Sequence, residues 1–449
     1  MEFENFKMEH IIDLNNSSKK VVKSINANQG LIKTYLNEKR NIQSIQNYVN
    51  EINRIVLEAK SSNDKKLCIV KKILMNEALL NVLEAFRNSD VFIRACRIRN
   101  KYALKWLLTM NINSCVQDEN GMTALMYAVQ DPKLSFVVKH LISDSDCLNI
   151  SDKNGETALF HAVHNITSFK LLLKTNINVN HLNYNNETVL IYCCKNQILK
   201  PIKYLIKIAN LNVNALDVQE KTAAMYLAEN GEYKGIQYLG RRNCKLNFIN
   251  QYNESALSLL LKNLYTEKNE EFCDKYYRTI VELVELGCNF NIPVDYDGNT
   301  AIMVFIIVKD YTSLQYVLKY GKDIDLSIQN YNGQTAEYFI RQQQRNYRRN
   351  LINEYPFLTS EVIRDLKSNI NLDDILSSFF QGENIPDEVY ENCYSYLSND
   401  FYIFNTTKYM KSVGKDIYSE GARKYEGKGH SEHFSFMFIV AIVAAVALL

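Results

Sequence analysis

The residues with reactive side chains are spread thinly along this sequence and form no familiar catalytic pattern. His161 and His164 form an H-x-x-H pair, the spacing of half a metal site, but no carboxylate or thiol follows at ligand spacing. The ten cysteines form no C-x-x-C pair and no cluster with histidines. Phosphate-binding glycine loops, nucleophile elbows and zinc-protease motifs do not occur in the sequence. We therefore expect no enzyme activity: no catalytic residue, no cofactor and no metal.

Composition and charge exclude further classes of function. The 449 residues carry 52 Lys+Arg against 50 Asp+Glu, and 47% are hydrophobic, as in an ordinary folded chain. A net charge of +2 excludes binding of nucleic acid through bulk charge, and no basic stripe with stacking aromatics stands out. Glu2, Glu4 and Glu9 stand where a secretory signal would be apolar. We expect no nucleic-acid partner, a reduced compartment for the scattered thiols, and no disulfide framework.

Seven related strings recur in order, and each places a hydroxyl residue before an apolar run. The first two strings read G-M-T-A-L-M-Y-A-V and G-E-T-A-L-F-H-A-V. The hydroxyl residues, called cap residues below, are Thr123, Thr157, Thr188, Thr222, Ser255, Thr300 and Thr335. Their spacings are 34, 31, 34, 33, 45 and 35 residues. A period of this size predicts stacked helical repeats that share one core.

Each position of the string has a physical reason. A Thr or Ser before an apolar run can cap a helix by accepting a hydrogen bond from an early N–H group. Two residues before the cap, six of the seven strings have Gly or Asn, which tolerate a positive φ, whereas Glu220 must be strained or use another turn. Five residues before the cap stand residues that can bond their own turn: Asp118, Asp152, Asn183, Asp217, Asn250, Asp295 and Asn330. A second apolar run follows each first one, so the unit is turn, helix, link, helix.

The repeat resembles the ankyrin repeat, whose period is about 33 residues and whose signature is T-P-L-H-x-A. Residues 157–162, T-A-L-F-H-A, come near that signature, with Ala in place of Pro. Asn149, Asn180, Asn214 and Asn247 stand eight residues before the cap, where the family has the Asn of V-N-x-x-D. The resemblance implies an all-α ankyrin-repeat solenoid of helix-turn-helix units with β-turn fingers over residues 89–350. In it, 89–110 is a degenerate first repeat, and His161 bonds within the turn.

The resemblance also implies a non-enzymatic scaffold that binds an unidentified protein partner on its concave surface. Carried over by register, the partner-binding residues are Glu119, Asn120, Met122, Lys153, Asn154, Glu156, Tyr184, Asn185, Glu187, Gln219, Lys221, Gln251, Tyr252, Glu254, Tyr296, Asp297, Asn299, Tyr331, Asn332 and Gln334. Tyr184, Tyr252, Tyr296 and Tyr331 are the expected hot spots, because rigid aromatic residues bury a large area at low entropic cost.

Two features depart from the family pattern. The sixth and seventh units carry Phe305 and Ile340 where a small residue is usual, and Glu337 where Leu is usual, so these units are expected to pack differently. The 45-residue interval has extra residues around 263–275, between the two helices of one unit. They predict longer helices or a protruding loop, either as a tolerated insertion or as a partner-specific contact.

Residues 1–88 are expected to form a helical N-terminal region that covers the first repeat. Apolar residues from Ile42 to Ala59 recur at steps of three and four, which predicts a helix that packs on its neighbour or forms a coiled coil.

Residues 351–412 are expected to form a helical cap. Within them, 385–400 (I-P-D-E-V-Y-E-N-C-Y-S-Y-L-S-N-D) resemble the opening of an F-box, although any capping helix would show the same features. A true F-box over 385–412 would make the protein a substrate receptor of a ubiquitin ligase that binds a Skp1-type adaptor.

Residues 434–449 carry no charge and, as a helix, would span about 24 Å, somewhat less than the ~30 Å hydrocarbon core. We interpret this segment as a hydrophobic C-terminal membrane anchor, and residues 413–433 as a flexible linker. The protein would then lie on the cytosolic face of a membrane. A segment buried in the core of a soluble cytoplasmic scaffold is the alternative.

Overall fold

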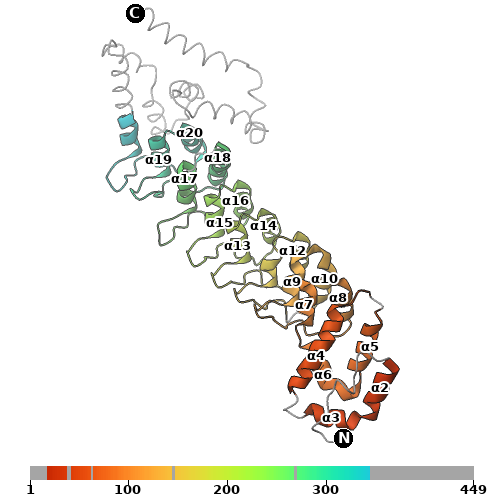
Figure 1. Cartoon of the computed structure of the whole chain (residues 1–449). Coiled ribbons are helices and arrows are strands. Elements are labelled where there is room, and N and C mark those ends of the chain that lie inside the picture. The colour runs from red at the N-terminus through yellow and green to blue at the C-terminus, as the bar shows by residue number, and fades with distance from the viewer. Residues whose placement is uncertain (1–17, 38–41, 62–63, 144–146, 267–269, 344–449) are drawn as a thin grey trace, which may run out of the picture. The chain divides into compact units, whose positions relative to one another are not determined.

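The regular structure of this chain is helical. A computed structural model describes residues 18–37, 42–61, 64–143, 147–266 and 270–343 (Figure 1). Within these ranges, β-pairing is confined to isolated bridges, of which Gln117–Thr123 and Ser151–Thr157 close the turn before a repeat helix. The predicted all-α fold is therefore confirmed.

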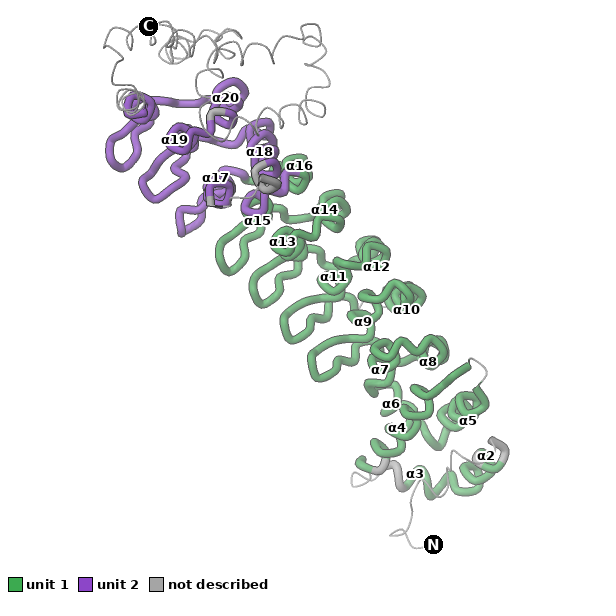
Figure 2. The backbone as a smooth tube through the Cα atoms, turned by 45° about the horizontal axis from the view of Figure 1, so that its top comes forward, with its two compact units in different colours: residues 1–227, 234–245 green, residues 228–233, 246–449 purple. Residues whose placement is uncertain are grey.

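The chain divides into two compact units (Figure 2). The first comprises residues 1–227 and 234–245, and the second comprises residues 228–233 and 246–449. Unit 1 begins with α2 (Ser18–Ala27), α3 (Gln29–Asn37), α4 (Ile42–Leu57), α5 (Lys65–Leu74), η3 (Glu77–Leu79) and α6 (Leu80–Arg87).

Helix α4 follows its apolar stripe. Val49, Ile52 and Val56 are fully buried, whereas Ile42 at the start of the stripe is 65% exposed. The helix packs on α5, α6 and α7 of the same chain, which accounts for the stripe without a coiled coil. Beyond its C-terminus, the Asn100 amide donates to the carbonyls of Leu57 and Ala59, both at 2.9 Å.

The repeats of unit 1 are pairs of short helices. They are α7 (Val91–Arg97), α8 (Lys101–Leu107), α9 (Ala124–Gln130), η4 (Pro132–Leu134), α10 (Ser135–Leu141), α11 (Ala158–His161), α12 (Ile166–Leu172), α13 (Val189–Lys195) and α14 (Leu199–Leu205). The first helix of one repeat packs on its own second helix and on the first helix of the next, as α9 does on α10 and α11. Helices α15 (Ala223–Glu229) and α16 (Tyr233–Gly240) contain residues of both units.

The hydroxyl caps form at six of the seven predicted positions. Each accepts a hydrogen bond from the N–H group three residues later, as Thr188 does from Ile191 at 3.3 Å. Thr157 is the exception, because its buried hydroxyl makes no cap bond to α11.

Unit 2 contains the long interval. Its helices are α17 (Ala256–Thr266), α18 (Glu270–Glu285), α19 (Ala301–Val308) and α20 (Tyr311–Tyr320). The extra residues lengthen α17 and α18. Asn263 Nδ2 and Tyr276 Oη both donate to the carbonyl of Glu229, at 2.7 and 3.0 Å. The longer helices thus brace the end of the preceding repeat.

Two of the three departures in the last two units lie in the core, whereas Glu337 is half-buried and pairs with Arg341. Phe305 is fully buried on α19, and Ile340 is 4% exposed. Helix α19 ends at Val308 and is capped by Lys309, which adopts a left-handed conformation with φ 62°.

The predicted segments 351–412, 413–433 and 434–449 lie outside the described residues, so the F-box resemblance and the membrane anchor remain predictions. Among the residues that the structure describes, no helix is both long enough and apolar enough to cross a bilayer.

Candidate partner-binding surface on the repeat fingers

The turn before each first helix forms a finger, which we define as the seven or so residues that end at the cap, such as 117–123. Five residues before the cap, an Asp or Asn oxygen accepts hydrogen bonds from the N–H groups two and four residues later. The distances are 2.8–3.1 Å in all seven fingers. The prediction that these side chains bond their own turn is confirmed. Each finger is therefore fixed locally by one side chain.

Two residues before the cap, every finger adopts a positive φ. The angles run from 54° to 76° for Gly121, Gly155, Asn186, Glu220, Asn253, Gly298 and Gly333. Glu220 adopts the common turn at φ 54° and does not use a different one. Because a Cβ atom disfavours this region, Glu220 is held there by the rest of its finger.

The remaining polar atom of each Asp or Asn is paired with a group of complementary hydrogen-bonding type. Each Asp faces a donor, and each Asn amide donates to an acceptor four residues later. The Asp pairs are Asp118–Tyr127 (2.8 Å), Asp152–His161 (3.0 Å), Asp217–Tyr226 (2.5 Å) and Asp295–Asn299 (2.7 Å). The Asn pairs are Asn183–Glu187 (2.8 Å), Asn250–Glu254 (3.2 Å) and Asn330–Gln334 (3.1 Å). Residues that could have faced a partner thus act inside the finger.

Burial and neighbouring groups in the fingers shift the pKa values of two carboxyl groups, Asp118 and Glu156. Burial alone would raise the pKa of Asp118, but hydrogen bonds from Tyr127 and from the N–H groups of Met122 and Asn120 lower it overall. Burial, with the charges of Asp152 and Glu187, raises the pKa of Glu156. The fingers of neighbouring repeats therefore bring carboxylates close together.

Asp152, Glu156 and His161 have ligand atoms within 4.8 Å of one another. One Asp152 oxygen accepts two backbone N–H bonds, and the other lies 3.0 Å from His161 Nε2. His164, the second member of the H-x-x-H pair, is exposed and is not part of this group. The hydrogen-bonding role expected for His161 accounts for the arrangement.

Backbone hydrogen bonds join four pairs of neighbouring fingertips. In unit 1, the N–H groups of Lys153, Tyr184 and Val218 donate to the carbonyls of Asn120, Asn154 and Asn185, at 3.0–3.1 Å. In unit 2, Tyr331 N–H donates to the Asp297 carbonyl at 2.9 Å. The tips that carry Lys153, Tyr184, Val218 and Tyr331 are thus each held by the tip before.

The structure divides the twenty predicted partner-binding residues into three groups. Thirteen are exposed: Glu119, Asn120, Lys153, Asn154, Tyr184, Asn185, Gln219, Gln251, Tyr252, Tyr296, Asp297, Tyr331 and Asn332. Glu156, Lys221, Glu254 and Gln334 are half-buried. Met122, Glu187 and Asn299 are buried, so their assignment to the surface is corrected. The position just before the cap lies in the finger, where Glu187 and Asn299 pair with Asn183 and Asp295.

The four predicted hot-spot tyrosines are all well exposed. Tyr296 is 93% exposed, Tyr184 74%, Tyr331 70% and Tyr252 58%. A Cβ atom added to Gly298 would lie 2.8 Å from Cδ1 of Tyr331, and one added to Gly155 would lie 3.0 Å from Cδ1 of Tyr184. The rings of Tyr331 and Tyr184 therefore lie against the glycine of the preceding finger, which limits their motion.

Sequence reasoning missed a set of exposed aliphatic residues on the fingers. Leu182 (48% exposed) and Leu216 (38%) in unit 1 and Ile249 (41%) in unit 2 lie six residues before their caps. Val218, in the same finger as Leu216, is 56% exposed. The common register of Leu182, Leu216 and Ile249 was the signal that could have revealed them, because a position that faces solvent in one repeat faces solvent in the next.

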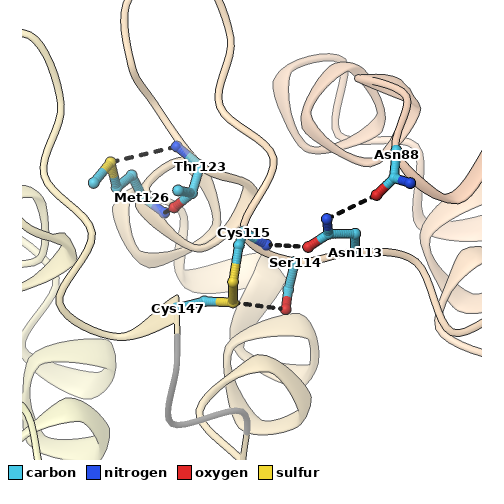
Figure 3. Close-up of a disulfide and its surroundings, with 7 residues drawn as sticks. All are labelled: Asn88, Asn113, Ser114, Cys115, Thr123, Met126 and Cys147. Carbon is cyan, nitrogen blue, oxygen red and sulfur yellow. Dashed lines mark hydrogen bonds between the residues drawn. A yellow bond between two sulfur atoms is a disulfide. The ribbon is translucent and has the colours of Figure 1, made fainter.

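The expectation of unpaired cysteines is wrong for one pair. Cys115 and Cys147 form a disulfide with a Cα–Cα distance of 5.0 Å (Figure 3). They are 32 residues apart, close to the repeat period, so stacking brings them together. Cys96, Cys193 and Cys194 are buried apolar groups, and burial raises the pKa of Cys96 to about 12 and also raises those of Cys193 and Cys194. Cys244 is half-buried, and its partial burial raises its pKa to about 11.

A family model matches part of the repeat region. A family model described as "Ankyrin repeats (3 copies)" matches residues 92–183, 133–217 and 165–250. Among solved structures, an ankyrin repeat domain from Acinetobacter baumannii is 20% identical over 43% of this chain and 95% of its own, with a TM-score of 0.39.

A chain from the complex of a Bdellovibrio bacteriovorus predatory endopeptidase with an immunity protein is 24% identical over 42% of this chain and 98% of its own, with a TM-score of 0.32. No curated protein matches the sequence. The family match covers residues 92–250, which include the repeats with caps Thr123, Thr157, Thr188 and Thr222. Over these residues the chain is therefore an ankyrin repeat protein.

Proposed function

We propose that this protein is a non-enzymatic scaffold whose repeat fingers bind a protein partner. The observation that carries the proposal is the register of exposed tyrosines on fingertips with a fixed backbone. In unit 2, Tyr252, Tyr296 and Tyr331 occupy successive fingers, and each finger is held by its Asn or Asp side chain. Large, exposed aromatic residues with a fixed backbone are favourable hot spots, because little conformational entropy is lost when a partner covers them.

The tyrosine rings differ in how firmly they are held. Tyr331 rests against Gly298, so part of its ordering cost is already met in the free protein. Tyr296 is 93% exposed and contributes mainly through the area that a partner would bury. Replacement of either by Ala is expected to weaken binding by about 2 kcal/mol, roughly thirtyfold in Kd.

Site-specific photo-crosslinking tests the proposal. A photoreactive phenylalanine analogue replaces Tyr296 on a finger, or Tyr320 as the matched control; Tyr320 lies on α20 and is 45% exposed. We expect one cellular protein to crosslink at position 296 and not at 320, and Tyr331→Ala to reduce that crosslink in the variant labelled at 296. Equal crosslinking at both positions, or no effect of Tyr331→Ala, would contradict binding at the fingers.

A second proposal concerns residues 434–449, and it rests on their sequence. The segment has no charged residue, so we infer that it attaches the scaffold to a membrane. Fractionation of cells that express the full chain tests this. The triple variant Ile439→Lys, Ile442→Lys and Val446→Lys keeps the length but makes the segment costly to insert. Release of that variant into the soluble fraction is the expected result, and a wild-type chain that is already soluble would refute the attachment.

A further inference from the structure

A ladder of asparagine side chains joins the bases of neighbouring fingers. An Asn eight residues before a cap (nine before Thr300) accepts, through Oδ1, a hydrogen bond from the N–H group ten residues before the next cap (eleven before Thr300). In unit 1 these rungs are Asn149 to Asn178, Asn180 to Asn212 and Asn214 to Lys245, each at 2.8 Å. In unit 2 the equivalent rungs are Asn247 to Asn289 (2.8 Å) and Asn291 to Asp325 (2.9 Å). Each rung crosses one repeat.

The disulfide occupies the first rung of the same ladder. Cys115 lies eight residues before Thr123, where the later repeats have the accepting Asn. Cys147 lies ten residues before Thr157, in the register of the donating residue. The covalent link of Cys115 to Cys147 therefore replaces the hydrogen bond that Asn149 makes to Asn178 one repeat later.

We propose that the Cys115–Cys147 pair is a redox-sensitive rung, which holds the base of the first two fingers firmly when oxidised and loosely when reduced. Reduction removes the link without restoring the Asn contact, because a thiol is a much weaker hydrogen-bond acceptor than an amide oxygen. None of the Asn rungs described above depends on redox state. The first rung is thus the point of the ladder that responds to thiols.

The difference in exposure between Cys115 and Cys147 decides which sulfur is attacked in thiol–disulfide exchange. Cys115 is half-buried and Cys147 is 3% exposed, so an incoming small-molecule thiolate reaches Cys115 Sγ first. Its attack forms a mixed disulfide on Cys115 and breaks the S–S bond, and Cys147 leaves with the electron pair as a thiolate. Ser114 Oγ lies 3.2 Å from Cys147 Sγ and can donate a hydrogen bond to that thiolate (Figure 3). A second thiol then releases Cys115, so two small thiols become one small disulfide, and the two protein sulfurs each gain a proton.

The reverse reaction closes the rung. A small-molecule disulfide such as oxidised glutathione accepts the two electrons, and the two protein thiols lose their protons to solvent. Buried Cys96, Cys193 and Cys194 compete poorly for the reagent, because burial raises their pKa values and leaves little thiolate. Cys68 is exposed and reacts independently, so Cys68→Ser is included in every protein tested.

The fingertips provide an internal control. The fingers of the first two repeats are also joined by Lys153 N–H to the Asn120 carbonyl (3.0 Å) and by Gln117 Nε2 to the Ser151 carbonyl (2.9 Å). These bonds contain no sulfur. Reduction is therefore expected to free the backbone around residues 147–149 while the amide of Lys153 stays protected.

Hydrogen exchange of the full chain, incubated with either oxidised glutathione or dithiothreitol, tests the proposal. Peptide mapping after alkylation identifies the linked Cys115 and Cys147 peptides in the oxidised sample. Reduction is expected to increase the rate of amide hydrogen exchange at residues 147–149 on the order of thirtyfold or more, because the disulfide no longer closes the loop between the two cysteines. A fully alkylated Cys115 and Cys147 after oxidation, or exchange that does not change on reduction, would overturn the proposal.

Two substitutions at Cys115 distinguish the loss of this rung from a general loss of stability. Cys115→Asn rebuilds the hydrogen-bonded rung, so its exchange at 147–149 should be slower than that of Cys115→Ala by roughly two- to tenfold and insensitive to reductant. Asn180→Ala is the matched control, because it opens a rung that dithiothreitol does not affect. Equal exchange in Cys115→Asn and Cys115→Ala would show that the two cysteines do not occupy the ladder.

Discussion

Substitution of one glycine per finger by alanine tests how neighbouring fingers support each other. Gly155 and Gly333 have nearly the same backbone, with φ of 76° and 71°. A Cβ atom at Gly155 would lie 2.9 Å from the backbone nitrogen of Tyr184 and 3.1 Å from Cα of Asn183. At Gly333 a Cβ atom would meet nothing within 4 Å. The pair therefore separates the conformational cost from the steric cost.

The expected free-energy changes differ by about 2 kcal/mol. A left-handed residue with a Cβ atom costs about 1–2 kcal/mol, and the smaller entropy of unfolded Ala offsets about 0.5–1 kcal/mol of this. Gly333→Ala should therefore destabilise by about 0.5–1 kcal/mol. Gly155→Ala adds the displacement of Tyr184, which costs about 1 kcal/mol of overpacking and about 1 kcal/mol for the lost bond from Tyr184 N–H to Asn154.

Two measurements on the full chain check these values. Urea denaturation gives the shift in midpoint, and hydrogen exchange of the peptide that contains Tyr184 reports the local bond. Tyr184 should lose protection in Gly155→Ala and keep it in Gly333→Ala. If both variants shift the midpoint equally and Tyr184 stays protected, the steric contact does not determine stability and the reasoning fails.

Three further predictions concern the finger side chains. Glu220→Gly should stabilise the protein by about 0.5–1 kcal/mol, because it relieves a non-glycine residue at φ 54°; an unchanged or lower thermal midpoint would contradict this. Glu156 has a pKa raised above its ordinary value of 4.5, so the folded state binds its proton more tightly and stability falls as pH rises from about 4 toward the folded pKa. Glu156→Gln should therefore be more stable than wild type at pH 7 in urea titrations, with the difference vanishing near pH 4. Asn183→Asp would place two buried carboxylates together at the 2.8 Å contact with Glu187 and should cost about 1–3 kcal/mol at pH 7. Addition of Glu187→Asn, which copies the Asp295–Asn299 pair, should recover part of that loss in the same titration.

The sequence alone determined the features that depend on near neighbours. Caps such as Thr188, the turn bonds of Asp118 and its equivalents, and the positive φ at Gly121 involve residues at most five positions apart, so residue type and spacing were sufficient. Exposure of the four tyrosines followed from the same register. The period itself predicted that helices would pair and stack.

Only the tertiary structure decided what happens between residues one repeat apart. Glu187 and Asn299 looked like surface residues, yet both are buried, and Asn299 accepts a hydrogen bond from the Asn330 amide of the next finger. The extra residues of the long interval could have formed a loop, but in the structure they extend α17 and α18, and Asn263 and Tyr276 bond to the carbonyl of Glu229. Cys115 and Cys147 are unremarkable in sequence and become bonded because one turn of the repeat returns the chain to the same position. Hydrogen bonds between near neighbours are determined by short sequence strings. The burial of a residue and its contacts with distant residues depend on which side chains the next repeat places beside it.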